Sequence, residues 1–424
     1  MIKKIKYVTI LLFILIGCGS TTNQKTQKPE KQKAPGLYLS KQQLPPDNIK
    51  SIQLQNQLGS TIPYLRLNSK EKLTLRFDEI TNEPRTFGIR FSRYDRDWKA
   101  DGQVPTQISD GQLEDLIELG DRSDNEFPAF FQSNYTFPNS RIQFRLSGNW
   151  LLEVFDYQDG EPLFSLPFMI TEQLGNVENR YETLNEFNQD SRFQHQHFVW
   201  YSFPESLQLP EYNVSIFGIQ DGRFATQKEL NIKDLSSRYE GKIRYHHERN
   251  DLFAANYDHQ KLDLTKLKEK NNIRFFEERG DKPALLSLFD DNPAFEQTDS
   301  FVLYNNPSNN RFDRYVEAEF SFVPNWETQE NEKIFVTGLF AQNAFYPELE
   351  LTWKSKEKRY TTRTLVKQGV YTYSYEVLRN GRLVKQLAQN PLGRTIRTYT
   401  ILVYYKDPGR FLDRLIYFKE FQTQ

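Results

Sequence analysis

The sequence predicts an all-β protein, made of tandem immunoglobulin-like, antiparallel β-sandwich domains that follow a lipoprotein signal and a disordered tether. Two observations favour strands over helices. Aromatic residues make up 14% of the chain, with 33 Phe and 23 Tyr, and aromatic and β-branched side chains are enriched in strands. Apolar residues also alternate with polar ones over short segments, such as Leu73 to Asp78. That period of two indicates half-buried strands.

The first residues have the layout of an export signal. Three lysines among the first six residues precede an apolar run over residues 7–16, which is too short for a permanent membrane-spanning helix. The segment Ile14 to Gly17, followed by Cys18, resembles the lipobox of bacterial lipoproteins, in which the cysteine is acylated. We therefore expect a signal peptide over residues 1–17 and a lipid on Cys18 that holds the protein on a membrane. An ordinary secretory signal is the alternative, and the single cysteine excludes an intramolecular disulfide.

Residues 18–46 are predicted to form a lipid-anchored, disordered tether, because their Lys, Gln, Thr and Pro leave almost nothing to bury. Lipoproteins of the Bacteroidetes type that reach the cell surface often carry acidic residues directly after the cysteine. Residues 19–24 contain none. By that resemblance we expect a lipid-anchored protein of the outer membrane that faces the periplasm.

The charge balance argues against one class of partner. The 55 Lys and Arg residues against 56 Asp and Glu leave a formal net charge of −1. Mixed charges of this kind form no basic surface for nucleic acid. No second apolar run is long enough to span a membrane. We expect no nucleic-acid partner and, apart from the lipid, a soluble protein.

Three β units are expected after the tether. The strands alternate in each unit and are separated by turns such as Asp159-Gly160. A strand from Thr398 to Tyr405 is expected to close the last unit. The predicted divisions are an N-terminal β-sandwich over residues 47–172, a linker over 173–193, a middle β domain over 194–295 and a C-terminal β-sandwich over 308–424.

Two local features bear on structure and function. Residues 371–375 alternate ahead of Asn380-Gly381, a dipeptide that favours a type I′ hairpin. In the first unit, a polar excursion over residues 101–131 is long for a compact domain, and a helical turn is expected within it at 112–117. Long loops on rigid scaffolds often carry function.

No familiar catalytic signature is present: there is no phosphate-binding glycine loop, nucleophile elbow or zinc spacing. His195 and His197 share a strand face and could bind a metal together with His259. We interpret them instead as surface and edge histidines, because no Cys or paired carboxylate accompanies them. We expect no enzyme activity, no cofactor, no metal and no small-molecule substrate, with a hydrolase as a minor alternative.

Asp95, Asp97 and Asp101 raise the possibility of a calcium loop. Lys99 stands where such a loop needs an oxygen ligand, and no bidentate Glu follows at the right distance. Aspartates that stabilise a turn are the simpler interpretation.

Trp326 and Trp353 are candidates for contact with a protein partner or for stacking on a glycan. Trp353 is the stronger candidate for an exposed ring, because polar residues follow it at 354–356. The tyrosines within residues 371–375 are assigned to the core or to an interface, since one face of each strand must be buried.

Two motifs resemble the plug-protein family of the type IX secretion system. The first lies within residues 98–154 and includes Pro138-Asn139 and Ser147-Gly148-Asn149, which leads into a strand at Trp150. The second combines residues 365–373 with a final Tyr-Tyr strand over 399–405. Together with the lengths of the units, the resemblance covers most of the chain after the signal.

The resemblance implies a non-enzymatic plug subunit that closes the periplasmic opening of the outer-membrane translocon barrel, its protein partner. Such a role needs a rigid β body, a lipid on Cys18 and a broad contact surface, which we expect at residues 101–131 or in the third unit. The alternative is a periplasmic or surface glycan-binding lipoprotein. Residues 338–340 and 367–375 are similar to sandwich modules attached to starch-active enzymes.

Overall fold

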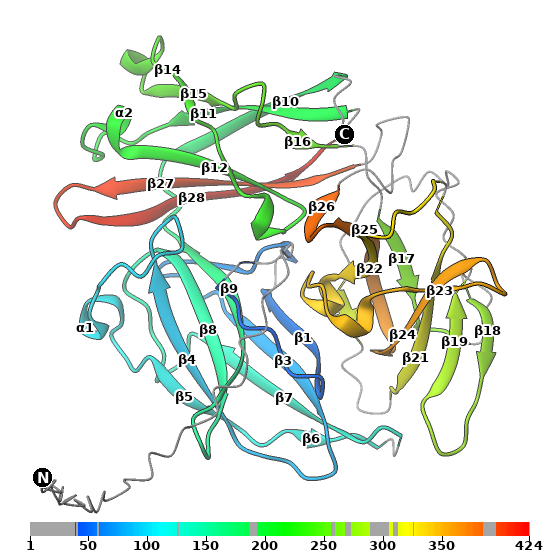
Figure 1. Ribbon diagram of the computed structural model, residues 1–424. Helices are drawn as coiled ribbons and strands as arrows, with labels where there is room; N and C mark the ends of the chain where they lie inside the picture. Colours follow the sequence, from blue (N-terminus) through cyan, green and yellow to red (C-terminus); the bar gives the residue numbers. More distant parts are fainter. Residues whose placement is uncertain are drawn as a thin grey trace, which may run out of the picture. The chain divides into compact units, whose positions relative to one another are not determined.

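The structure is a computed structural model. All the residues that it describes fall in one compact unit, and within them strands form six sheets (Figure 1). The described residues are 39, 41–56, 59–124, 127–185, 193–255, 259–267, 273–288, 305–307, 313–324, 326–384 and 396–423. The all-β prediction is confirmed, because the helices in these ranges are short. They are α1 (Pro105–Ile108), α2 (Pro210–Asn213), and the 3-10 turns η1 (Phe224–Thr226), η2 (Arg238–Glu240), η3 (Leu339–Ala341) and η4 (Pro347–Leu349).

The first sandwich contains two sheets that share one core. Leu73, Leu75 and Phe77 are buried as their alternation predicted, and the core also holds Trp150 and Phe168. One sheet has the order β1 (Ile49–Asn56), β3 (Leu73–Ile80), β7 (Phe130–Phe137), β6 (Asp121–Arg122). The other has the order β2 (Tyr64–Arg66), β9 (Pro162–Thr171), β8 (Gly148–Asp156), β4 (Phe87–Tyr94), β5 (Glu114–Ile117).

The middle sandwich joins strands from distant parts of the chain around a second core, which includes Tyr201, Tyr245 and Val403. One sheet has the order β10 (Asn176–Asn185), β11 (Phe193–Ser202), β15 (Lys242–His246), β14 (Ile232–Asp234), with β16 (Phe253–Ala254) also paired to β11. The other has the order β13 (Lys228–Glu229), β12 (Val214–Gln220), β27 (Thr398–Asp407), β28 (Leu412–Gln422).

The third sandwich also has two sheets around one core. In one, β17 (Gln260–Asp263), β20 (Asn305–Pro307), β22 (Glu332–Gly338) and β26 (Arg382–Val384) all pair with β25 (Gly369–Arg379). The other has the order β18 (Ile273–Glu277), β19 (Ala284–Leu288), β21 (Tyr315–Phe322), β24 (Arg359–Lys367), β23 (Thr352–Lys354). Tyr371, Tyr373 and Tyr375 lie in this core, as predicted. Asn380 and Gly381 have φ of 53° and 73°, which confirms the type I′ hairpin between β25 and β26.

The strand pairing differs from the predicted grouping in three places. The predicted linker 173–193 contains β10, an edge strand whose mostly exposed side chains gave no apolar pattern. The predicted closing strand of the third unit, Thr398 to Tyr405, lies in β27 and pairs with β12 of the middle sandwich. The predicted helical turn at 112–117 is wrong, because Glu114–Ile117 form the edge strand β5. Local alternation identifies a strand but not its partner, which explains these differences.

Candidate functional site

The two tryptophans singled out from the sequence occupy different environments. Trp353 lies on edge strand β23, is 49% exposed, and packs on Tyr360 with ring centroids 5.0 Å apart. Trp326 is half-buried against the third core beside Phe322, and its Nε1 donates to Glu332 Oε2 at 3.3 Å. A partner can therefore reach the ring of Trp353, whereas Trp326 supports the core. The third residue of interest from the sequence, the cysteine at position 18, lies outside the described residues.

His195, His197 and His259 were expected at the surface but are buried, and His247 is buried as well. His195 Nδ1 lies 2.8 Å from the hydroxyl of Tyr399, and the rings of His197 and His247 are 5.9 Å apart. Burial lowers the pKa of His195 and of His247 to about 4, and it lowers the pKa of His197 well below its usual value. The sequence showed only that two imidazoles share a strand face; sheet packing covers that face.

The aspartates of the predicted turn act on backbone groups and on an arginine. Asp95 Oδ1 accepts hydrogen bonds from the backbone N–H of Asp97 and of Lys99, at 3.0 and 2.7 Å. Asp101 accepts from the buried guanidinium of Arg93. The interpretation as turn aspartates is confirmed. Among the described residues, no three His, Cys, Asp or Glu side chains form a group that could hold a metal ion.

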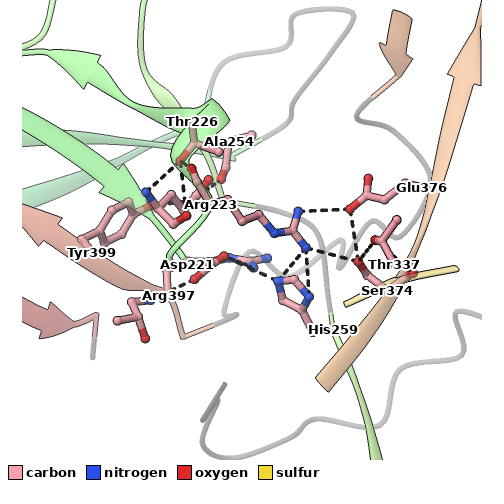
Figure 2. Close-up of polar contacts among 12 residues, drawn as sticks. Asp221, Arg223, Thr226, Ala254, His259, Thr337, Ser374, Glu376, Arg397 and Tyr399 are labelled. Atoms are coloured by element: carbon pink, nitrogen blue, oxygen red, sulfur yellow. Dashed lines mark hydrogen bonds and ion pairs between the residues drawn. The ribbon is translucent and has the colours of Figure 1, made fainter. Parts of the chain in front are cut away.

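A buried ionic network joins the middle sandwich to the third sandwich (Figure 2). Asp221, directly after β12, accepts from Arg397 Nη1 at 3.0 Å and lies 3.5 Å from His259 Nε2. Burial alone would raise the pKa of Asp221, but Arg397, His259 and Arg223 hold it well below its usual value. Burial and Arg223 lower the pKa of His259 to about 3. The imidazole is therefore neutral, and it donates from Nε2 to Asp221.

Arg223 links this network to strand β25. Its Nη1 lies 3.1 Å from Glu376 Oε1, and its Nη2 donates to Ser374 Oγ at 3.2 Å and to His259 Nδ1 at 3.3 Å. Two carboxylates therefore face two guanidinium groups around one neutral imidazole. Opposite charges in equal number reduce the cost of burying ions, and each link fixes the orientation of the next side chain.

A second buried ion pair joins the first sandwich to the third sandwich. Asp78 on β3 accepts from Lys367 Nζ at 2.8 Å and from the hydroxyl of Tyr315 at 2.8 Å. Both charged side chains are almost fully buried, and Lys367 Nζ lies 4.4 Å from the ring centroid of Phe130. Burial raises the pKa of Asp78, an effect that the lysine opposes. The pair, with the hydrogen bonds of Gln132 to Asp78 and of Ser51 to Tyr315, therefore forms a buried polar joint.

A third joint connects the first sandwich to the final strands and uses the residues that carried the sequence resemblance. Asn149 accepts from the hydroxyl of Tyr404 at 2.5 Å and donates to the Asp95 carbonyl at 2.8 Å. Gly148, at φ +133°, leaves room for Arg93, because a Cβ there would lie 2.8 Å from its guanidinium. The two motifs, distant in sequence, therefore meet in the fold.

An apolar cluster completes this third joint. It combines side chains from the outer face of the first sandwich with side chains from the sheet that contains β12, β27 and β28. Its buried members are Leu39, Ile62, Trp98, Leu151, Met169, Phe217, Ile219, Leu402, Tyr404, Leu415 and Phe418. Three joints of different chemistry thus connect the sandwiches.

Sequence reasoning missed Asp78, Lys367, Asp221 and Arg397 as joint residues. Alternation places Asp78 on the solvent side of its strand, and Asp221-Gly222 has the residue pattern of an ordinary turn. The only sequence signal for these joint residues was a charged side chain within or beside an apolar strand. A strand with one face in water shows the same pattern, so the signal does not identify a buried ion pair. In the described part of the chain, no helix is long and apolar enough to cross a membrane.

Comparison with known families identifies the first sandwich. Residues 49–172 match the model of the first domain of the type 9 secretion system plug protein. That range lies within the predicted N-terminal β-sandwich and spans nearly all of it. The match confirms the resemblance for the first motif, at residues 98–154, whereas the second motif, at 365–373 and 399–405, lies outside the matched range. No curated protein matches the chain.

Solved structures give the fold of the whole body. A hypothetical protein from Parabacteroides merdae superposes with a TM-score of 0.77 at 19% identity, covering 90% of this chain and 99% of that protein. At this identity the likeness shows the fold alone. The biofilm-associated protein BSP domain has a TM-score of 0.17 at 8% identity, over 94% of this chain and 62% of that one. The latter likeness is too weak to carry an argument.

Proposed function

We propose that this chain, whose residues 49–172 match the first domain of the type 9 secretion system plug protein, closes the periplasmic opening of the outer-membrane translocon barrel. The family match is the observation that carries the proposal. The role is non-enzymatic: it requires a body that keeps its shape against a wide pore. It also requires a lipid on Cys18 that keeps the body at the outer membrane, facing the periplasm.

The three joints support this role physically. A plug made of independent domains on flexible linkers would not keep one shape across a large opening, because domains with weak interfaces move relative to one another. Here Asp78–Lys367, the Asp221–Arg397 network and the Asn149–Tyr404 contact restrain the sandwiches. Each joint contains buried polar groups in linked hydrogen bonds, which favours one geometry over others.

Co-purification tests the proposal directly. The full chain, tagged at its C-terminus and extracted from outer membranes in mild detergent, should bring down the translocon barrel in a fixed molar ratio. Cys18→Ser should prevent acylation of the N-terminal peptide, seen by mass spectrometry, and should reduce the amount of barrel recovered from cells. Repeated recovery of the tagged chain without the barrel would contradict the proposal.

Glycan binding remains a second candidate, because the ring of Trp353 is accessible beside Tyr360. If it is correct, Trp353→Ala should abolish retention on a polysaccharide matrix, since one lost stacking platform removes much of a small interface. Trp326→Ala is the matched control for general destabilisation, because that ring packs against the core. A plug should show neither retention nor an effect of these changes on barrel recovery.

A further inference from the structure

Two neighbouring loops of the middle sandwich expose four large apolar side chains. Leu209 is 60% exposed and Tyr212 75%, in the loop that contains α2; Leu235 is 37% exposed and Tyr239 87%, in the loop after β14. A group of large apolar side chains left in contact with water is informative in a way that a single exposed Leu is not. We call these four residues, with Arg238 between them, the loop patch.

Polar contacts hold the two loops together. Lys233 Nζ donates to the carbonyls of Glu211 and Val214, at 3.4 and 3.0 Å, so the start of the second loop is fixed against the first. The pKa of Arg238 is raised first by its hydrogen bond to the Tyr239 hydroxyl, with smaller contributions from Glu211 and Tyr212. The Lys233 contacts place the loop of Leu209 and Tyr212 beside the strand that leads into the loop of Leu235 and Tyr239.

The loops are also pre-formed. The backbone N–H of Gln208 and its carbonyl both pair with the hydroxyl of Tyr405, each at 3.2 Å. The side chain of Asn213 donates to the carbonyl of Gln208 at 3.0 Å. In the second loop, Arg238 N–H donates to the Leu235 carbonyl at 3.1 Å. Side chains displayed on such restrained loops lose little conformational entropy on binding.

Leu209 adds an observation that points to a partner. Its φ of 48° and ψ of 56° are left-handed, a conformation that is costly for a bulky residue and easily adopted by Asn or Gly. Position 209 therefore carries an exposed apolar side chain in a backbone conformation that Asn adopts at lower cost. Strain of this kind concentrates at functional positions.

We propose that the loop patch is a docking surface for a folded protein, and specifically for the translocon barrel, an identification that rests on the proposed function. Tyr and Arg, which the patch contains, are enriched at protein–protein interfaces. Acidic Glu205, Glu211 and Glu240 stand among the basic groups, which disfavours an anionic lipid surface. Each of the four side chains spans at most ~200 Å² and is only 37–87% exposed, so together they offer roughly 500 Å², less than the about 800 Å² per partner of a standard stable interface. The patch would thus anchor a larger interface.

Binding of purified barrel to the full chain in detergent tests the proposal. Tyr212→Ser with Tyr239→Ser should weaken binding at least tenfold. Leu209→Asn should also weaken it, while leaving the urea midpoint equal to or above that of the wild type, because Asn tolerates the left-handed backbone. Tyr157→Ser is the matched control: Tyr157 is a 54% exposed tyrosine in a turn of the first sandwich, and its loss should change affinity less than twofold.

Each contrary outcome has a separate meaning. If the barrel binds all variants as it binds the wild type, the docking inference is wrong while the proposed function stands. If the barrel binds neither wild type nor variants, the proposed function fails and the inference fails with it. Patch-dependent self-association in sedimentation would assign the surface to a second copy. Patch-dependent sedimentation of the Cys18→Ser chain with phosphatidylglycerol vesicles would assign it to lipid. Either of these last results overturns the proposal.

Discussion

His195 and His247 are neutral in the folded protein, because burial lowers the pKa of each to about 4, whereas an unfolded histidine titrates near 6.5. The unfolded chain therefore binds protons that the folded chain excludes as the pH falls below about 6.5. Stability from these groups is fully present above pH 6.5 and is lost as the pH falls toward 4. Each of the two should contribute a loss of about 2 kcal/mol between pH 7 and pH 5.

Urea denaturation at the two pH values measures this effect. His247→Phe should shrink the difference in unfolding free energy between pH 7 and pH 5, because one proton-binding site is gone. Phe168→Leu, which alters a ring of the first core that packs on Phe137 and on none of these histidines, should lower stability equally at both pH values. An equal pH dependence in wild type and His247→Phe would show that the imidazole already titrates normally.

Removing one partner of the Asp78–Lys367 pair should lower the unfolding free energy more than replacing both partners. Lys367→Met leaves the Asp78 carboxylate buried without its cation, and removal of one partner of a buried pair costs about 3–5 kcal/mol. Lys367→Met combined with Asp78→Asn should cost less than Lys367→Met alone, because no unpaired charge remains. Lys333→Met, which breaks the exposed pair with Glu350, should change the urea midpoint little. A double variant less stable than both single variants would contradict this account.

At the scale of elements, the β25–β26 hairpin gives the sharpest test of a local prediction. Gly381 has φ +73°, and a Cβ added there would meet no atom within 4 Å, so a substitution encounters backbone strain and no clash. Gly381→Val should destabilise the protein by ~1 kcal/mol or more. Gly280 is equally open but has no left-handed φ, and Gly280→Val should be nearly neutral. Equal denaturation midpoints for the two variants would exclude a strained turn.

Elements were predictable where burial imposed a pattern on one strand face. Strand β3 alternates because one of its faces meets the first core, and the Asn380-Gly381 turn was readable because its conformation selects those residue types. Strand β10 was assigned to a linker because an edge strand with exposed side chains needs no apolar pattern. Edge strand β5 was missed for the same reason.

At the scale of the whole molecule, the sequence pattern could not predict which strands pair with one another. Strand β27 pairs with β12, although the strands of the third sandwich lie between them in the sequence. No local feature of either strand specifies its partner. The joint residues were hidden for a related reason, because Asp78 and Asp221 look like solvated charges until another sandwich covers them. The motifs at Asn149 and at Tyr404 were visible individually, and only the fold shows that they touch.

The barrier across the outer membrane tests the central claim most directly. In cells that lack this protein but keep the translocon barrel, an antibiotic too large for ordinary porins should enter and kill, because the barrel stays open to the periplasm. Wild-type protein supplied from a plasmid should restore exclusion, and removal of the barrel as well should also restore it. If cells without the protein exclude the antibiotic as well as the wild type while the barrel is present, the protein is not the plug.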